Sequence, residues 1–134
     1  MHFGKNVYAN FGLTLVDDTH KYVGDYTMLG PNVVIATAGH PILPELREKA
    51  YQYNIPVHIG RNCWLGAGVI VLPGVTIGDN SVIGAGSVVT KDIPSNVLAF
   101  GNPCRVQREI NEHDREFYFK NRTIPQEIKN KYGI

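Results

Sequence analysis

The middle of the chain repeats every six residues, and this period limits the possible folds more than any other feature of the sequence. Six consecutive units over residues 59–94 each begin with an aliphatic residue: Ile59, Leu65, Val71, Ile77, Ile83 and Val89. The second position is glycine in four of these units. A helix cannot keep residues six apart on one face, and a simple strand would not carry a turn signal in every unit. The period therefore predicts short strands joined by turns, with three units closing each triangular coil of a parallel β-helix.

The same phase continues upstream and is interrupted by one long segment. Residues 23–40 form a further coil of three units, and Phe3, Ala9 and Leu15 occupy the first positions of an earlier, looser coil. Residues 41–56 show no six-residue pattern. We expect them to form a loop extruded from the prism, and long loops of this kind often carry function.

The composition changes after the last repeat unit. Residues 111–114 resemble a helix N-cap followed by an acidic residue, a variant of the capping box. They predict a short helix that runs through residues 117–119, and a second helix is expected after Pro125. We therefore predict an all-β domain over residues 1–104 and a short helical tail over residues 105–134.

Length and composition exclude several classes of protein. The 134 residues fit one domain, and the formal net charge of +1 argues against a general nucleic-acid binder. Hydrophobic residues make up 43% of the chain, which is enough for a core. No apolar run approaches the ~20 residues that a membrane helix needs. Since there are two cysteines, Cys63 and Cys104, and no secretory signal is visible, we expect a protein of the reducing cytoplasm.

Several motifs beyond the repeat occur in a fixed order along nearly the whole chain. They are Asn10, the Val-Asp-Asp of 16–18, the Gly-His-Pro of 39–41, the Pro-Gly-Val-Thr-Ile-Gly-Asp-Asn of 73–80 and the Asn-Pro-Cys-Arg of 102–105. In these features the chain resembles the maltose/galactoside O-acetyltransferase family of hexapeptide-repeat acyltransferases. The resemblance implies a left-handed β-helix and a homotrimer with active sites between subunits. It also implies transfer of an acetyl group from acetyl-CoA to a hydroxyl of a sugar.

His40 is the candidate general base. It ends a coil and opens the long loop, so its ring is not expected in the core. An alcohol is a weak nucleophile, and a neutral imidazole, with a usual pKa of about 6.5, can accept its proton at neutral pH. The residues alone are equally compatible with a histidine held between glycine and proline for turn reasons. The resemblance favours the base, acting in a direct transfer.

The resemblance assigns two further residues to the acceptor. Asn10 would donate through its amide to the substrate or to the developing oxyanion, and Asp18 would accept hydrogen bonds from sugar hydroxyls. From the residues alone, Asn10 is also compatible with an asparagine at a corner of the prism, and Asp18 with a solvated turn. Asp17 is a candidate for orienting a histidine. Trp64, the only tryptophan, is a candidate either for lining the substrate slot or for packing against a neighbouring subunit.

The donor side requires a slot for pantetheine and cations for phosphates. Two Gly-Ala-Gly triplets, centred on Ala67 and Ala85, are 18 residues apart, so they stack on one corner and let an extended arm approach the backbone. The N–H of Ala67 is a candidate donor to the thioester oxygen. The alternative is that these glycines are present only because the turns require them. With the resemblance, the expected CoA-binding residues are Ala67, Ala85, Thr90, Lys91, Arg105 and Arg108.

Two other functions are compatible with the sequence. One is acetylation of an antibiotic or another small-molecule hydroxyl, and the other is a catalytically impaired trimeric scaffold. The impaired scaffold is considered because the sequence departs from the family pattern at one point. Family members begin with a helical segment that precedes the first coil, whereas Met1 falls at the start of the repeat here. We therefore expect weaker acceptor binding than in the relatives. We expect no metal requirement, since no close histidine pair occurs along the sequence, and neither nucleic acid nor membrane as a partner.

Overall fold

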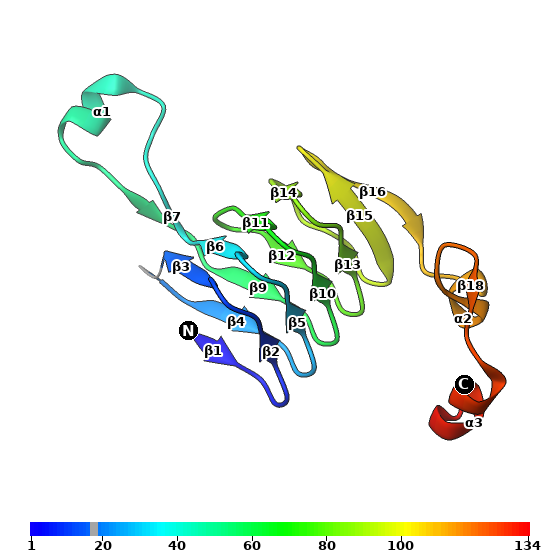
Figure 1. The fold of residues 1–134 in the computed structure, drawn as a ribbon. Helices are drawn as coiled ribbons and strands as arrows, with labels where there is room; N and C mark the ends of the chain where they lie inside the picture. Colours follow the sequence, from blue (N-terminus) through cyan, green and yellow to red (C-terminus); the bar gives the residue numbers. More distant parts are fainter. Residues whose placement is uncertain (17–18) are drawn as a thin grey trace.

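The computed structural model describes residues 1–16 and 19–134. The chain winds into a three-sided prism of short strands, stacked coil on coil (Figure 1). The extruded loop leaves the prism near its N-terminal end, and the C-terminal segment leaves it at the opposite end. The parallel β-helix predicted from the period is therefore confirmed.

Each coil adds one strand to each of three sheets, which we name A, B and C. Sheet A has the order β1-β4-β9-β12, sheet B the order β16-β15-β13-β10-β5-β2, and sheet C the order β14-β11-β6-β3. In sheet A the strands are β1 (His2–Phe3), β4 (Lys21–Val23), β9 (Val57–Ile59) and β12 (Thr76–Ile77). In sheet B they are β2 (Tyr8–Ala9), β5 (Met28–Leu29), β10 (Trp64–Leu65), β13 (Val82–Ile83), β15 (Val97–Gly101) and β16 (Cys104–Glu109). In sheet C they are β3 (Thr14–Val16), β6 (Val34–Ala36), β11 (Ile70–Val71) and β14 (Val88–Val89).

The first position of each six-residue unit builds the core. Every such residue in 59–94 is buried, with Ile59 the most exposed at 3%. Leu65 lies in register with Leu29 on one side and Ile83 on the other, so aliphatic side chains stack along the inside of sheet B. Phe3 is 49% exposed, because its coil has a neighbouring coil on one side only. The core thus runs the length of the prism and thins at the first coil.

Asparagines form one corner of the prism. Asn62, Asn80 and Asn96 have φ values of 53°, 63° and 61°, in the left-handed region that asparagine tolerates better than most residues. Their side chains are hydrogen-bonded in a ladder, with Asn62 Nδ2 donating to Asn80 Oδ1 (3.3 Å) and Asn80 Nδ2 to Asn96 Oδ1 (2.8 Å). The corner therefore turns in the same way in each coil and keeps successive coils in register.

The segment 41–56 leaves the prism as expected. At its base β7 (Ala38–Gly39) pairs antiparallel with β8 (Tyr53–Asn54), and the short helix α1 (Pro44–Glu48) lies beyond them. Figure 1 shows this arm extending away from the three sheets. Ile42 in the arm is 93% exposed.

The C-terminal segment differs from the expected pair of helices. Residues Cys104–Glu109 form β16, which pairs antiparallel with β15 at the end of sheet B. The helix predicted through residues 117–119 is wrong: α2 (His113–Glu116) ends at Glu116, and β17 (Phe117–Phe119) pairs with β18 (Arg122–Thr123). Three consecutive aromatic residues favour an extended strand over a helix. The helix after Pro125 is confirmed as α3 (Gln126–Tyr132). None of the helices in the described part of the chain is long and apolar enough to cross a bilayer.

Candidate active site

His40 lies immediately after β7, where the arm leaves the prism, and its side chain is exposed. Its Nδ1 lies 2.8 Å from the carbonyl oxygen of Tyr51. A carbonyl oxygen can only accept a hydrogen bond, so Nδ1 carries the proton in this contact. In the neutral ring Nε2 then has a free lone pair and is the atom available to accept a proton.

The base of the arm fixes the position of His40. Gly39 lies opposite Tyr53 in the antiparallel pair, and a Cβ built on Gly39 would collide with the Tyr53 hydroxyl and ring. A larger residue before the histidine would therefore displace the Tyr53 side chain from its place. The Tyr51 N–H donates to the carbonyl of Leu46 at the end of α1 (3.0 Å), which orders the residue that holds the imidazole.

Asn10 follows β2 at the corner between sheets B and C. Its Oδ1 accepts a hydrogen bond from the N–H of Phe11 (2.8 Å), and this contact identifies which side-chain atom is the oxygen. The Nδ2 group is then left to donate. Asn10 lines a hollow of about 550 Å³ together with Ala67 and Ala85. Asn10 and the two alanines, which are candidates for binding the acceptor and the donor, thus line one cavity.

The two Gly-Ala-Gly corners stack as predicted. The Gly86 N–H donates to the carbonyl of Ala67 (2.8 Å), and Gly68 and Gly86 have φ values of +70° and +72°. Within the described residues, neither the Ala67 N–H nor the Ala85 N–H donates to another group of the chain. Both residues are exposed, and they lie one coil apart at the same corner.

The candidate phosphate-binding residues lie in two places. Thr90 and Lys91 are exposed at the corner where the chain leaves sheet C, one hexad after the second Gly-Ala-Gly corner. Arg105 and Arg108 lie on β16 at the last edge of sheet B. Arg105 Nη1 donates to the carbonyl of Cys104 (3.1 Å).

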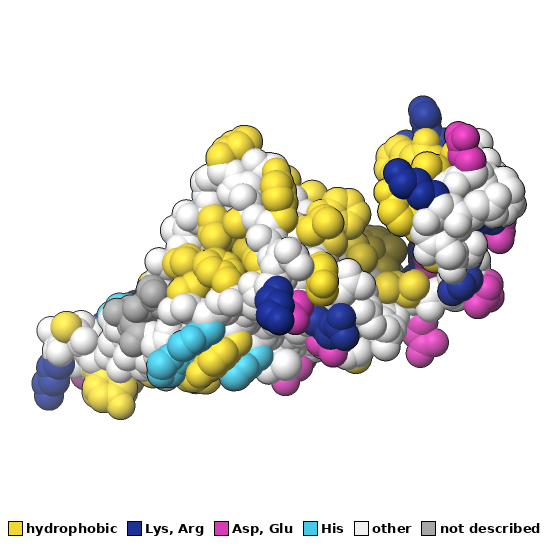
Figure 2. Space-filling model, turned by 90° about the horizontal axis from the view of Figure 1, so that it is seen from below, with side chains coloured by type: hydrophobic (Ala, Val, Ile, Leu, Met, Phe, Trp, Pro, Cys, Tyr) yellow, Lys and Arg dark blue, Asp and Glu magenta, His cyan; other side chains and the backbone are white. Residues whose placement is uncertain are grey.

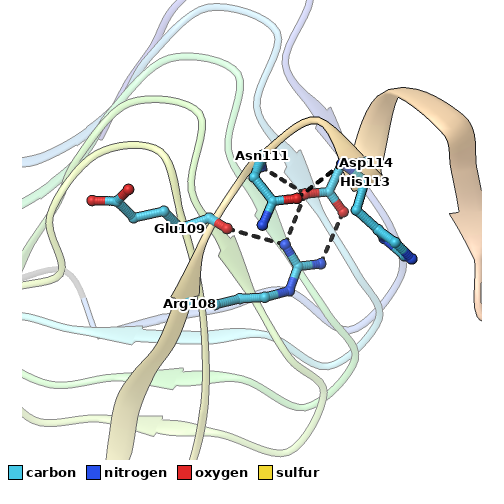
Figure 3. A network of polar contacts seen from close by, with 5 residues as sticks. All are labelled: Arg108, Glu109, Asn111, His113 and Asp114. Carbon is cyan, nitrogen blue, oxygen red and sulfur yellow. Dashed lines mark hydrogen bonds and ion pairs between the residues drawn. The ribbon is translucent and has the colours of Figure 1, made fainter.

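Arg108 is engaged within the chain. Its Nη1 and Nη2 donate to Asp114 Oδ2 and Oδ1 at 2.7 and 2.8 Å, as Figure 3 shows. The paired guanidinium lowers the pKa of Asp114 from 3.8 to about 2. Asp114 also accepts from the Asn111 N–H (2.9 Å), while Asn111 Oδ1 accepts from the His113 N–H (3.0 Å). This reciprocal pattern confirms the predicted capping-box variant and anchors α2 to β16.

One chain does not bring all the candidate residues together. Asn10, Ala67 and Ala85 lie where the chain passes from sheet B to sheet C, whereas His40 and Lys91 lie where it leaves sheet C. His40 is not among the residues that line the hollow beside Asn10. Asp17 and Asp18 lie outside the described residues.

Sequence reasoning missed several residues of this region. Tyr8, Met28 and Leu98 also line the hollow, and their outward positions in the hexads were the available signal. Trp64 lines it too and is 56% exposed. Tyr51 acts through its backbone, so its residue type gave no signal. Cys63 is buried, and burial raises the pKa of its thiol, which makes it a poor nucleophile. No group of three potential metal ligands occurs among the residues described.

The chain is similar to proteins of one family over most of its length. A family model for bacterial transferase hexapeptide repeats (six repeats) matches residues 56–91. The galactoside O-acetyltransferase of Lactococcus lactis is 64% identical over 118 residues, which are 88% of this chain and 57% of that protein.

Two solved structures extend this similarity to the fold. A galactoside acetyltransferase in complex with coenzyme A superposes with a TM-score of 0.91 at 55% identity, over 92% of this chain and 62% of that one. A maltose O-acetyltransferase from Clostridium difficile gives a TM-score of 0.81 at 56% identity, over 83% and 59%. The chain thus spans less than two thirds of the length of these relatives. With its left-handed parallel β-helix, it belongs to the maltose/galactoside O-acetyltransferase family of hexapeptide-repeat acyltransferases.

Proposed function

We propose that this chain carries the transfer site of an acetyl-CoA-dependent O-acetyltransferase whose acceptor is a hydroxyl of a maltose- or galactoside-type sugar. The observation that carries the proposal is the contact between His40 Nδ1 and the Tyr51 carbonyl, because it leaves Nε2 as the proton acceptor. The relatives named for galactoside and maltose O-acetyl transfer, and the coenzyme A bound to one of them, support the choice of substrates.

The reaction is a direct transfer. His40 Nε2 takes the proton of the acceptor hydroxyl while the oxygen attacks the carbonyl carbon of the thioester. The resulting tetrahedral oxyanion collapses, the carbon–sulfur bond breaks, and the CoA sulfur takes the proton back from the imidazolium. The products are the O-acetyl sugar and CoA with a free thiol.

Groups around the hollow supply the donors that this transition state needs. In this proposal the N–H of Ala67, which donates to no other described group, stabilises the developing oxyanion, and Asn10 Nδ2 binds the acceptor or the same oxyanion. Ala85, one coil further, continues the slot for the pantetheine arm. The acceptor role of Asp18 is part of the proposal and rests on the resemblance.

Cations at two edges of the prism would bind the CoA phosphates. Lys91 and Arg105 are exposed, and Thr90 offers a hydroxyl beside Lys91. Arg108 donates to Asp114 through both terminal nitrogens, so a phosphate would compete with that carboxylate or share the guanidinium with it. We therefore rank Arg108 below Lys91 and Arg105 as a phosphate ligand.

A homotrimer in the cytoplasm completes the proposal. His40 and Asn10 lie at different corners of one prism, so in the proposed trimer a site takes His40 from one subunit and Asn10 from another. Large apolar side chains on the outer side of sheet B, including Met28 (55% exposed) and Trp64 (56%), offer surface for such contacts.

The experiment that tests the proposal measures CoA release from acetyl-CoA by the purified chain, with and without a panel of sugars. We expect sugar-dependent release that the His40→Ala variant loses, and light scattering that gives three times the 14.9 kDa of one chain. An intact trimer without turnover on any sugar would instead identify a scaffold. Release that the variant retains would place the base elsewhere.

A further inference from the structure

Three histidines and a tyrosine gather along the outer face of sheet A, in a row that begins with His20 at the corner between sheets C and A. Figure 2 shows histidine side chains close together on this face. Tyr22 stacks between His2 and His58, with ring centroids 4.7 Å apart on both sides. His20 precedes β4, and its Nδ1 lies 3.0 Å from His2 Nε2. The sequence separates these two imidazoles by 18 residues, and the coil brings their nitrogens into contact.

We propose that His2 and His20 chelate a late first-row divalent cation of the Cu²⁺ or Ni²⁺ type. With metal–nitrogen bonds of about 2.1 Å, two nitrogens 3.0 Å apart subtend an angle of about 90° at the ion. That angle suits neighbouring positions of a square-planar or octahedral ion. A tetrahedral ion would need the nitrogens about 3.4 Å apart. The observed separation is thus closer to the spacing for Cu²⁺ or Ni²⁺ than to the spacing for tetrahedral Zn²⁺.

The surrounding strands hold the two rings before any ion binds. His2 lies on β1 directly opposite Tyr22 on β4, and the Tyr22 ring flanks both imidazoles, with its centroid 4.7 Å from His2 and 5.9 Å from His20. The His20 carbonyl accepts from the Val57 N–H (3.2 Å), which ties this residue to the next coil. Little side-chain entropy is then lost on chelation.

The protons and the remaining coordination positions are consistent with this site. In the neutral pair one imidazole donates to the other, and binding of the ion moves that proton to the outer nitrogen of the same ring, so no proton is released. Both side chains are exposed, so water can occupy the other positions. The ion would link β1 to β4 and stabilise the first coil, which has the thinnest core.

The test is calorimetric titration of the untagged full chain with NiCl₂ and with ZnCl₂ at neutral pH. We expect one ion per chain and tighter binding of nickel than of zinc. Loss of a second-shell group already costs about 10–100-fold in metal affinity, so His2→Ala and His20→Ala should each weaken binding at least about tenfold. The matched control is His58→Ala, which removes a histidine from the same row but leaves the pair intact. Its affinity should equal that of the wild-type chain.

Thermal unfolding without metal checks that each variant is folded, and unfolding with nickel should show a stabilisation that both single variants lose. Three results would overturn the proposal. The first is that the wild-type chain binds no nickel. The second is that His20→Ala binds nickel as tightly as wild type while His2→Ala does not, which would place the ion on the first residues of the chain alone. The third is that His58→Ala loses as much affinity for nickel as the two pair variants do.

Discussion

The Nδ1 atom of His40 lies 2.8 Å from the carbonyl oxygen of Tyr51, 11 residues further along the chain. The two residues are at the two ends of the extruded arm, and the β7–β8 pair brings those ends together. A backbone acceptor fixes the tautomer of the imidazole without introducing a second charge. The arm is thus a means of orienting one ring, and its geometry leads to the first two predictions.

Replacing His40 with alanine should remove most turnover and leave the binding of acetyl-CoA nearly unchanged. Loss of a general base typically costs ~10²–10⁴-fold in rate. The proposed contacts to acetyl-CoA come from the Ala67 and Ala85 amides and from Lys91 and Arg105, so we expect donor binding to survive loss of the imidazole. Steady-state kinetics on both substrates and calorimetry with CoA measure the two effects. Wild-type turnover at saturating substrates in the variant would show that the base is another group.

Gly39→Ala should lower turnover by displacing His40 without touching its ring. The added Cβ would collide with the hydroxyl and ring of Tyr53, so this partly exposed side chain must shift, and we expect the β7–β8 pair and the imidazole next to it to shift with it. A double-mutant cycle with Tyr53→Ala isolates this cause, because the smaller side chain removes the collision. We expect Gly39→Ala to cost much less in the Tyr53→Ala background than in the wild type. An equal cost in both backgrounds would rule out the steric explanation.

The period of six was sufficient to predict the coils, because burial of every first position sets both the strand length and the register. The helix prediction for the C-terminal segment was wrong, because there the packing of neighbouring side chains determines the secondary structure. Residues 117–119 carry a helix-like start but form a strand, since three aromatic side chains pair better in an extended hairpin than they fit a helix.

The candidate residues of the site come from the sequence, whereas the contacts that these residues make could not be predicted from it. The interaction of His40 with Tyr51 uses a backbone atom, which no residue pattern reveals. The pairing of Arg108 with Asp114 joins β16 to α2 across a turn, and it depends on the extended geometry of a segment that was expected to be helical. His2 and His20 are brought together by the coil alone.

The phosphate assignment predicts a selective effect on the donor. Lys91→Ala and Arg105→Ala should each raise the apparent constant for acetyl-CoA and leave that for the acceptor unchanged, because charge-assisted contacts to phosphate are lost. Arg108→Ala should have a smaller effect, since its guanidinium is held by Asp114. Repeating the kinetics with the dephospho form of the donor identifies the residue that contacts the 3′-phosphate. Replacing that residue should raise the apparent constant less for this donor than for acetyl-CoA. Equal losses with both donors at all three positions would contradict the assignment.

The pair of Arg108 and Asp114 predicts a dependence of stability on pH. The pKa of Asp114 falls from 3.8 to about 2 in the folded chain, so the unfolded chain binds the proton more readily. The stabilisation is therefore complete above about pH 4 and is lost as the pH falls toward about 2.

Asp114→Asn should lower the free energy of unfolding at neutral pH by ~0.2–1 kcal/mol, as is usual for partly exposed pairs. Urea denaturation at neutral and acidic pH should show this difference shrinking as the pH falls. The control is Glu112→Gln, whose carboxylate lies 3.8 Å from Arg115 in a more exposed pair and should change little. A difference that persists at the lowest pH would show that Asp114 acts by some means other than its charge.

The separation of His40 from Asn10 makes a prediction that a single mutant cannot test. If each site takes His40 from one subunit and Asn10 from its neighbour, then a trimer that mixes His40→Ala chains with Asn10→Ala chains contains some sites with both residues intact. With random assembly of equal amounts, about a quarter of the sites of a cyclic trimer would be wild type. Co-expressing the two variants should therefore restore activity well above that of either variant alone.

The control is a chain that carries both substitutions, mixed with the His40→Ala chain. No site in that mixture has both residues, so no activity should return, although the trimers are equally mixed. If the first mixture also stays inactive while mass spectrometry shows that mixed trimers have formed, then His40 and Asn10 act within one chain. The arm would then have to fold back across sheet C to reach the hollow that Asn10 lines, because Asn10 precedes a strand of that sheet and His40 follows one.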